Sequence, residues 1–182
     1  MFWYIDPSHA QVNFSVKHMM VSTVRGRLGK VTGRLQLDPK APEKGDFEIS
    51  VDVGGINTND DRRDGHLRSG DFFDVENHPT ITFKSTAVFP KGEGRYAASG
   101  DLTIRGVTRP QSFDIELVGI GPNGKGGQLL GATATTTIDR TAFGLVWNMP
   151  VTNGVLVGEQ VKVEVDLEAL DESTAKERGL AA

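Results

Sequence analysis

The chain of 182 residues contains no cysteine. This absence excludes disulfide bonds and thiolate metal sites, and it leaves the redox compartment undecided. No apolar run approaches the roughly 20 residues that a membrane-spanning helix needs.

A net charge of −4 gives no electrostatic basis for binding nucleic acid. Residues 1–6 lack the basic and apolar regions of a signal peptide. We therefore expect a cytoplasmic protein if Met1 is the native start.

Alternation of apolar and polar residues runs through most of the chain. In residues 11–17, for example, Val12, Phe14 and Val16 alternate with polar side chains. Each such segment has one apolar and one polar face, which is typical of an antiparallel sheet that is wetted on one side. With shorter candidates at 3–5 and 145–147, the pattern predicts an all-β fold of about eight to ten strands that closes into a barrel or splits into two sheets. The clear segments are 11–17, 31–37, 47–53, 81–84, 96–105, 112–117, 130–138 and 161–168.

Two segments interrupt the alternation. Met19–Val24 is interpreted as a short helical turn or lid after the first long strand. Asp60–Ser69 predicts a short helix, with Thr58 or Asn59 as its N-cap and Gly70 as the residue that stops it.

The end of the chain, Asp171–Ala182, is polar and rich in helix formers. We expect a frayed tail there, so that residues 1–170 form the barrel domain and residues 171–182 a polar C-terminal tail.

Small side chains are frequent at the inward positions of the strands. A barrel of this strand number can hold one small ligand, and an apolar void is costly unless something fills it. Alternatively, large residues on facing strands fill the space and leave a packed core. The small inward residues are Gly33, Ala98, Gly100, Ala132 and Ala134.

The segment that most resembles an enzyme signature lies around His66. An acid/base pair of His66 with Asp64 or Asp71 is conceivable, but no nucleophile with a recognisable elbow accompanies it. A structural interpretation is favoured, in which Asp64 pairs with Arg68 on the helix and His66 bonds a loop carbonyl.

The sequence also holds candidate residues for a metal site and for an anion site. No histidine pair has the spacing of a metal site, so no metal or other cofactor is expected. A cationic group could meet an anionic head group such as pyrophosphate. Surface charge balanced by Asp60, Asp61 and Asp64 is the favoured alternative. The cationic group is Arg62, Arg63 and Arg68 with Lys17 and His18.

Several motifs, taken together, resemble the YceI-like lipid/polyisoprenoid-binding family. They occur in family order from Trp3 to about Ala169. The matching segments are Ile5–His9, Val12–Met19, Val24–Gly26, Asn57–Thr58, Arg63–Arg68, Asp71–Val75, His78–Phe83, Gly100–Thr108 and Asp139–Leu145.

This resemblance implies an extended lipocalin-like β-barrel with one or two short helices that holds a long isoprenoid chain. Its role would be carriage or storage rather than catalysis. Members are often dimeric, so a homodimer is compatible with the resemblance, as is transient contact with a membrane. Many members are secreted to the periplasm behind a signal peptide, so the resemblance implies a periplasmic protein if a signal peptide has been removed. Two alternatives stay open: an enzyme acting on an isoprenoid or fatty substrate with His66 or His18 as acid/base, and a stress-related structural module without a ligand.

The expected ligand is a polyprenyl or isoprenoid-quinone lipid, and its lining follows from the inward parity of the strands. Met19, Met20 and Val21 are added as an adaptable lid. Phe72 and Phe73 are added as a plug or mouth of the barrel, and Trp147 as a second plug. The strand positions are Phe14, Val16, Leu35, Ile49, Val51, Ile81, Phe83, Leu102, Ile104, Phe113, Ile115, Ala134, Val163 and Val165.

Overall fold

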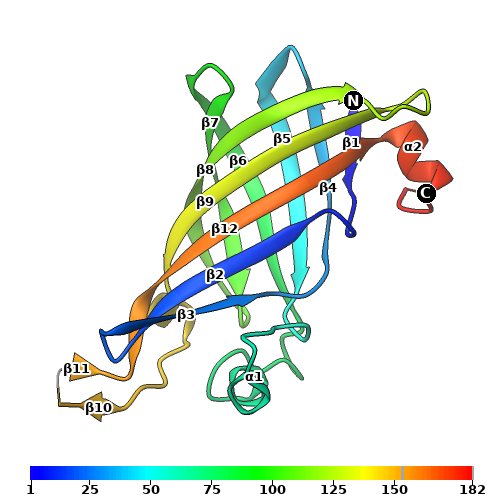
Figure 1. Cartoon of the computed structure of the whole chain (residues 1–182). Helices are drawn as coiled ribbons and strands as arrows, with labels where there is room; N and C mark the ends of the chain where they lie inside the picture. The colour runs from blue at the N-terminus through cyan, green and yellow to red at the C-terminus, as the bar shows by residue number, and fades with distance from the viewer. Residues whose placement is uncertain (153, 182) are drawn as a thin grey trace.

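A computed structural model describes residues 1–152 and 154–181. Eight antiparallel strands close into a barrel in the order β1-β4-β5-β6-β7-β8-β9-β12, and β1 pairs with both β4 and β12 (Figure 1). The strands are β1 (Phe2–Ile5), β2 (Gln11–His18), β3 (Ser22–Arg27), β4 (Val31–Asp38), β5 (Ala41–Asp52), β6 (Thr80–Gly92), β7 (Arg95–Ile104), β8 (Val107–Pro122), β9 (Gln128–Asp139), β10 (Pro150–Val151), β11 (Gly154–Val155) and β12 (Val157–Asp171). The helices are α1 (Asp61–Arg68), the 3-10 helix η1 (Arg140–Phe143) and α2 (Glu172–Glu177).

The predicted all-β antiparallel barrel is confirmed. β2 and β3 extend the sheet beyond the ring along the edge of β12, where Phe14 faces Val163 in the register. β10 and β11 form a separate small hairpin. The expected strand at 145–147 is wrong, because these residues lie in an irregular loop after η1. Neither α-helix in the described part of the chain is long and apolar enough to cross a membrane.

The segment Met19–Val24 is not helical, contrary to the sequence-based expectation. β3 begins at Ser22, and the chain reverses between β2 and β3 through Met19 and Met20, whose φ angles are 51° and 59°. Such a turn with two positive φ angles is the tight connection that the twist of an antiparallel pair favours. Turns of this type usually contain Asn-Gly. The hairpin was not predicted because apolar residues occupy those positions here.

Helix α1 lies below the barrel in Figure 1. Its N-cap is Asp60, whose side chain accepts a hydrogen bond from the Arg63 backbone N–H, and not Thr58 or Asn59 as predicted. Ser69 is the C-cap of the helix, so Gly70 does stand at the predicted C′ position. It is not among the glycines with a positive φ angle, so it does not form the left-handed cap that is usual there.

The end of the chain is ordered rather than frayed through residue 181. α2 follows β12 directly, and its residues Thr174 and Ala175 are buried against the barrel. Asp171 caps this helix by accepting a hydrogen bond from the Thr174 backbone N–H at 2.8 Å. The helix formers that suggested a loose tail thus form a docked element.

Candidate functional site

An apolar cavity of about 250 Å³ runs along the barrel interior. One water takes only about 10–15 Å³ on this measure, so the space suits an extended guest rather than single waters. Among the described lining residues, only Tyr96, Thr133 and Arg140 carry a polar side-chain group. The interior can therefore solvate a hydrocarbon chain and offers few partners for a polar one.

The lining extends from one end of the barrel to the other. At the end of the β4–β5 and β6–β7 hairpins it includes Leu37, Pro42 and Tyr96. At the α1 end it includes Phe72 and Phe73, which follow α1 and pack in the cluster around Phe83 and Leu102. The two phenylalanines thus lie at one end of the cavity, and their role as its plug or mouth stays a prediction.

Of the twenty residues predicted to bind a ligand, sixteen line this cavity: Phe14, Val16, Leu35, Ile49, Val51, Phe72, Phe73, Ile81, Phe83, Leu102, Ile104, Phe113, Ile115, Ala134, Val163 and Val165. Their contact with a ligand stays a prediction. Met19, Met20, Val21 and Trp147 are not among the lining residues. The first three are exposed at the β2–β3 turn, and Trp147 packs outside Phe72 with 5.4 Å between the ring centroids.

Some lining residues were missed by the sequence analysis. Val12, Leu37 and Leu167 share the inward parity of their strands and could have been included on that signal. Phe143 and Leu145 could not, because they lie in η1 and the loop after it, where no strand period applies.

Within the described part of the chain, Arg140 is the one charged side chain of the lining, and it is 6% exposed. Its guanidinium donates hydrogen bonds to the backbone carbonyls of Leu145, Trp147, Val157 and Gly158. Burial lowers the pKa of this guanidinium below its usual value, although Glu159 and Asp139 oppose the shift. These hydrogen bonds connect η1, the loop after it and the start of β12, which together we call the end wall of the barrel.

The Arg63–Arg68 segment makes contacts within its own corner of the fold. Asp64 is 3% exposed and accepts hydrogen bonds from the backbone N–H and the hydroxyl of Thr58. Arg63 donates to the Thr58 hydroxyl at 2.7 Å, and Arg68 donates to the carbonyl oxygens of Gly54 and Ile56. The expected Asp64–Arg68 pair is wrong, because each of the two residues instead holds the loop before α1.

His66 is bonded to Asp71 rather than to a loop carbonyl, with 2.8 Å from Nε2 to the carboxylate oxygen. Its ring meets Phe72 and Trp147 edge-on, at centroid distances of 5.1 and 4.7 Å. Neither His66 nor His18, the two candidate acid/base residues, is among the residues that line the cavity.

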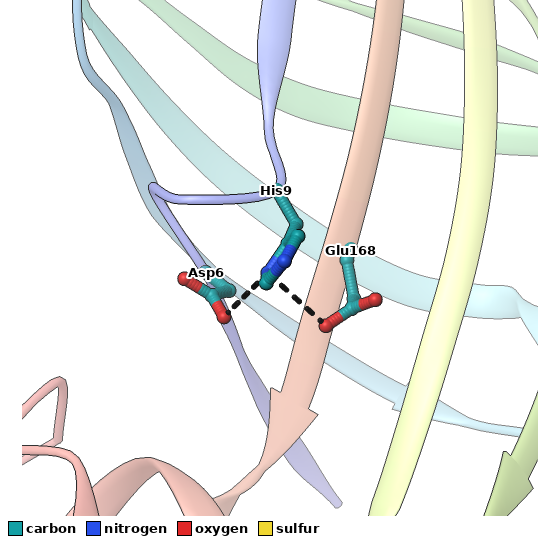
Figure 2. A group of neighbouring side chains, drawn as sticks. All are labelled: Asp6, His9 and Glu168. Carbon is teal, nitrogen blue, oxygen red and sulfur yellow. Dashed lines mark hydrogen bonds and ion pairs between the residues drawn. The ribbon is translucent and has the colours of Figure 1, made fainter. Parts of the chain in front are cut away.

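A second cluster, which the sequence analysis did not find, joins the two ends of the chain (Figure 2). His9 Nδ1 lies 3.0 Å from Asp6 Oδ2 and 3.7 Å from Glu168 Oε1. Arg178 also donates to Asp6 Oδ2 at 2.7 Å, and the Ser8 backbone N–H donates to Oδ1 at 2.9 Å. Both oxygens of Asp6 are thus engaged within the protein, and Arg178 holds the end of α2 to the β1–β2 loop.

The charges of this cluster stabilise one another. Burial opposes ionisation of Asp6, but its hydrogen bonds from Ser8 and His9 and the charge of Arg178 keep its pKa below the usual value. The hydrogen bond to Asp6 and the charge of Glu168 raise the pKa of His9. The arrangement is that of an ion-pair network in which a metal ion would have to displace Arg178.

A closed antiparallel barrel with an apolar interior defines a lipocalin-like fold. The chain belongs to the YceI-like domain family, whose model matches residues 3–169. A UPF0312 protein of Vibrio cholerae is 38% identical over 138 residues, which are 76% of this chain and 73% of the relative.

Two solved structures share the fold. Burkholderia cenocepacia BcnA superposes with a TM-score of 0.77 at 22% identity and covers 90% of this chain and 98% of its own. A polyisoprenoid binding domain from Saccharophagus degradans superposes with a TM-score of 0.65 at 14% identity, covering 92% and 97%.

Proposed function

We propose that this protein binds and carries, or stores, a long-chain isoprenoid lipid in the barrel without catalysing a reaction on it. The apolar cavity that runs between the two ends of the barrel carries this proposal. A polyprenyl chain or the tail of an isoprenoid quinone is long, narrow and free of polar groups. Removal of each of its methylene groups from water contributes about 0.8 kcal/mol to binding. Membership of the YceI-like family and the name of the Saccharophagus relative support the same class of ligand.

The geometry favours binding over catalysis. A reaction needs an acid, base or nucleophile within reach of the substrate. The described lining holds two ionisable side chains, Arg140 and Tyr96. Arg140 is committed to four carbonyl oxygens, Tyr96 lies at the opposite end of the cavity, and His66 and His18 lie outside the lining.

The proposal is tested on protein purified from a bacterial host. Organic extracts are analysed by mass spectrometry, and the intact protein is analysed by native mass spectrometry. We expect a co-purifying apolar lipid of long chain length at close to one per barrel, because an unfilled apolar cavity of this size costs stability. Extracts without lipid above the level of a mock purification, and a mass equal to that of the bare chain, would contradict the proposal.

A further inference from the structure

A group of exposed apolar side chains lies at the β2–β3 turn and in the loop that bonds to it, at the same end of the barrel as α1 (Figure 1). We call it the hairpin-tip patch and define it as Met19, Met20, Val21, Val146 and Met149. Val21 is 82% exposed and Met20 is 58% exposed. Contiguous exposed apolar surface, unlike scattered single residues, is typical of sites that bind a protein or a membrane.

Backbone hydrogen bonds hold the two parts of the patch together. The Met19 N–H donates to the Leu156 carbonyl at 2.8 Å, and the Leu156 N–H donates to the Met149 carbonyl at 2.9 Å. The β2–β3 turn and the loop after η1 are therefore joined into one continuous surface, which we call the ledge.

The patch begins where the cavity lining ends. Val16 lines the cavity, and Met19 and Met20 follow it at the end of β2. Leu145 lines the cavity, and the exposed Val146 follows it directly. A partner that covers the patch therefore meets the α1 end of the lipid cavity.

The turn keeps methionine where other residues would fit the backbone better. Both Met19 and Met20 have positive φ angles, at which Asn and Gly are preferred. Strain of this kind is concentrated at functional segments. Flexible methionine side chains also adapt to irregular apolar surroundings such as lipid chains.

The charge next to the patch has one sign. Residues 7–37 contain five Lys or Arg and no Asp or Glu, whereas the rest of the chain has 15 Lys or Arg against 24 Asp or Glu. Within the described residues, no carboxylate lies within 4.0 Å of Lys17, Arg25 or Arg27, so these three charges remain available to an anionic partner.

The other charges at this end are of both signs. At the start of α1, Asp60 and Asp61 are followed by Arg62 and Arg63, and Asp71, Asp74 and Glu76 come after the helix. On β12, Glu159 lies in the irregular stretch opposite the end of β2. The hairpin is thus the cationic element of an otherwise acidic molecule.

We infer that the hairpin-tip patch docks the barrel on an anionic lipid bilayer, with the methionines entering the acyl boundary and Lys17 and Arg25 meeting the head groups. Apolar side chains flanked by cations are what binds proteins to such interfaces. This inference goes beyond the proposed function, and vesicle binding is measured whether or not the cavity carries a lipid.

The test is sedimentation of the purified protein with vesicles of phosphatidylcholine alone, or of phosphatidylcholine with phosphatidylglycerol. We expect binding to the anionic vesicles, and we expect this binding to decrease as salt screens the charges.

The double variant Met19→Asn with Met20→Gly should bind about tenfold more weakly, because it removes the inserted side chains. Its Tm should equal or exceed that of the wild type, since Asn-Gly suits the turn. Lys17→Gln should weaken binding about fivefold.

Val118→Ser is the matched control, because Val118 is 68% exposed on β8, away from the ledge. It should leave vesicle binding unchanged. The inference is wrong if the wild type binds neutral and anionic vesicles equally, or if the control loses as much binding as the turn variant. It is also wrong if the protein ignores vesicles and forms a dimer that the turn variant dissociates, since the patch would then be covered by a second copy.

Discussion

Several side chains in this protein hold loops in place through hydrogen bonds, and Asp64 is the clearest example. Its buried carboxylate accepts two hydrogen bonds from Thr58, and Arg63 donates to the same threonine. A sequence of Arg-Asp-Gly-His resembles catalytic machinery because those side chains also carry chemistry. Only the burial of Asp64 and the direction of its hydrogen bonds identify an architectural corner.

Replacing Asp64 tests this corner. Asp64→Ala should lower the free energy of unfolding by about 1–3 kcal/mol, because the Thr58 N–H and hydroxyl lose a buried acceptor. Lipid loading of the folded fraction should stay near the wild-type level. Urea unfolding and lipid extraction measure the two effects, with Asp61→Ala, at an exposed position of the same helix, as the control. Unchanged stability with abolished loading would show that the corner acts on the ligand instead.

Two glycines show why inward parity alone overstated the free space. A Cβ on Gly33 would lie 2.4 Å from the Glu48 carbonyl oxygen, and one on Gly100 would lie 2.2 Å from that of Lys84. Neither residue lines the cavity, and Ala98 is also absent from the lining. These small residues let neighbouring strands approach closely, whereas Ala132 and Ala134 do leave room in the lumen. Sequence shows that a residue is small but not which neighbour requires it.

At the scale of elements, the strands could be predicted and the connections could not. A strand buries every second residue, so it can be recognised from the alternation of apolar and polar residues in the sequence. The β2–β3 turn and the end wall around Arg140 depend on backbone hydrogen bonds between distant segments, which leave no period. Helix α2 was misjudged for a similar reason, since its burial comes from the barrel and from the Arg178–Asp6 ion pair.

Asp171 makes the docking of α2 sensitive to acid. Burial raises its pKa, but hydrogen bonds from Thr174, Gln128 and Ser173 outweigh that effect and lower the pKa from 3.8 to about 2. A group with a depressed pKa in the folded state stabilises the fold above its unfolded pKa, and the contribution disappears as the pH falls through its folded pKa. The relevant window is therefore between about pH 4 and pH 2.

Asp171→Asn isolates this charge, because asparagine is also a good N-cap. At pH 5 the variant should be less stable than the wild type by about 1–2 kcal/mol, after allowance for solvent screening. The difference should shrink between pH 4 and pH 2. Chemical unfolding at each pH measures it, and Glu177→Gln removes a charge from an exposed position of the same helix for comparison. A difference that is constant with pH would exclude ionisation of Asp171 as the cause.

On the scale of the whole molecule, closure of the barrel decides what the interior can do. Pairing of β1 with both β4 and β12 removes the free edges of the ring, so the inner face is enclosed by strands on all sides. The family resemblance predicted this closure, and the periodicity predicted most of the side chains that face inward. Neither could distinguish a filled interior from a cavity, because that depends on how residues from opposite walls meet.

Two tryptophan substitutions on neighbouring positions of β9 test whether the cavity is the binding site. Ala134 lines the lumen, whereas the adjacent Thr135 is exposed on the outer face. In a cavity that holds a lipid chain, the ring of Ala134→Trp occupies the space of the guest, so the protein should stay folded with a Tm close to the wild-type value and carry little lipid. In a packed core the same change would cost about 1–3 kcal/mol or more through overpacking. Thr135→Trp should be folded and fully loaded. Melting curves and lipid extraction on both variants decide the matter, and loss of lipid from the Thr135 variant alone would mean that the outer wall of the barrel, not its lumen, holds the ligand.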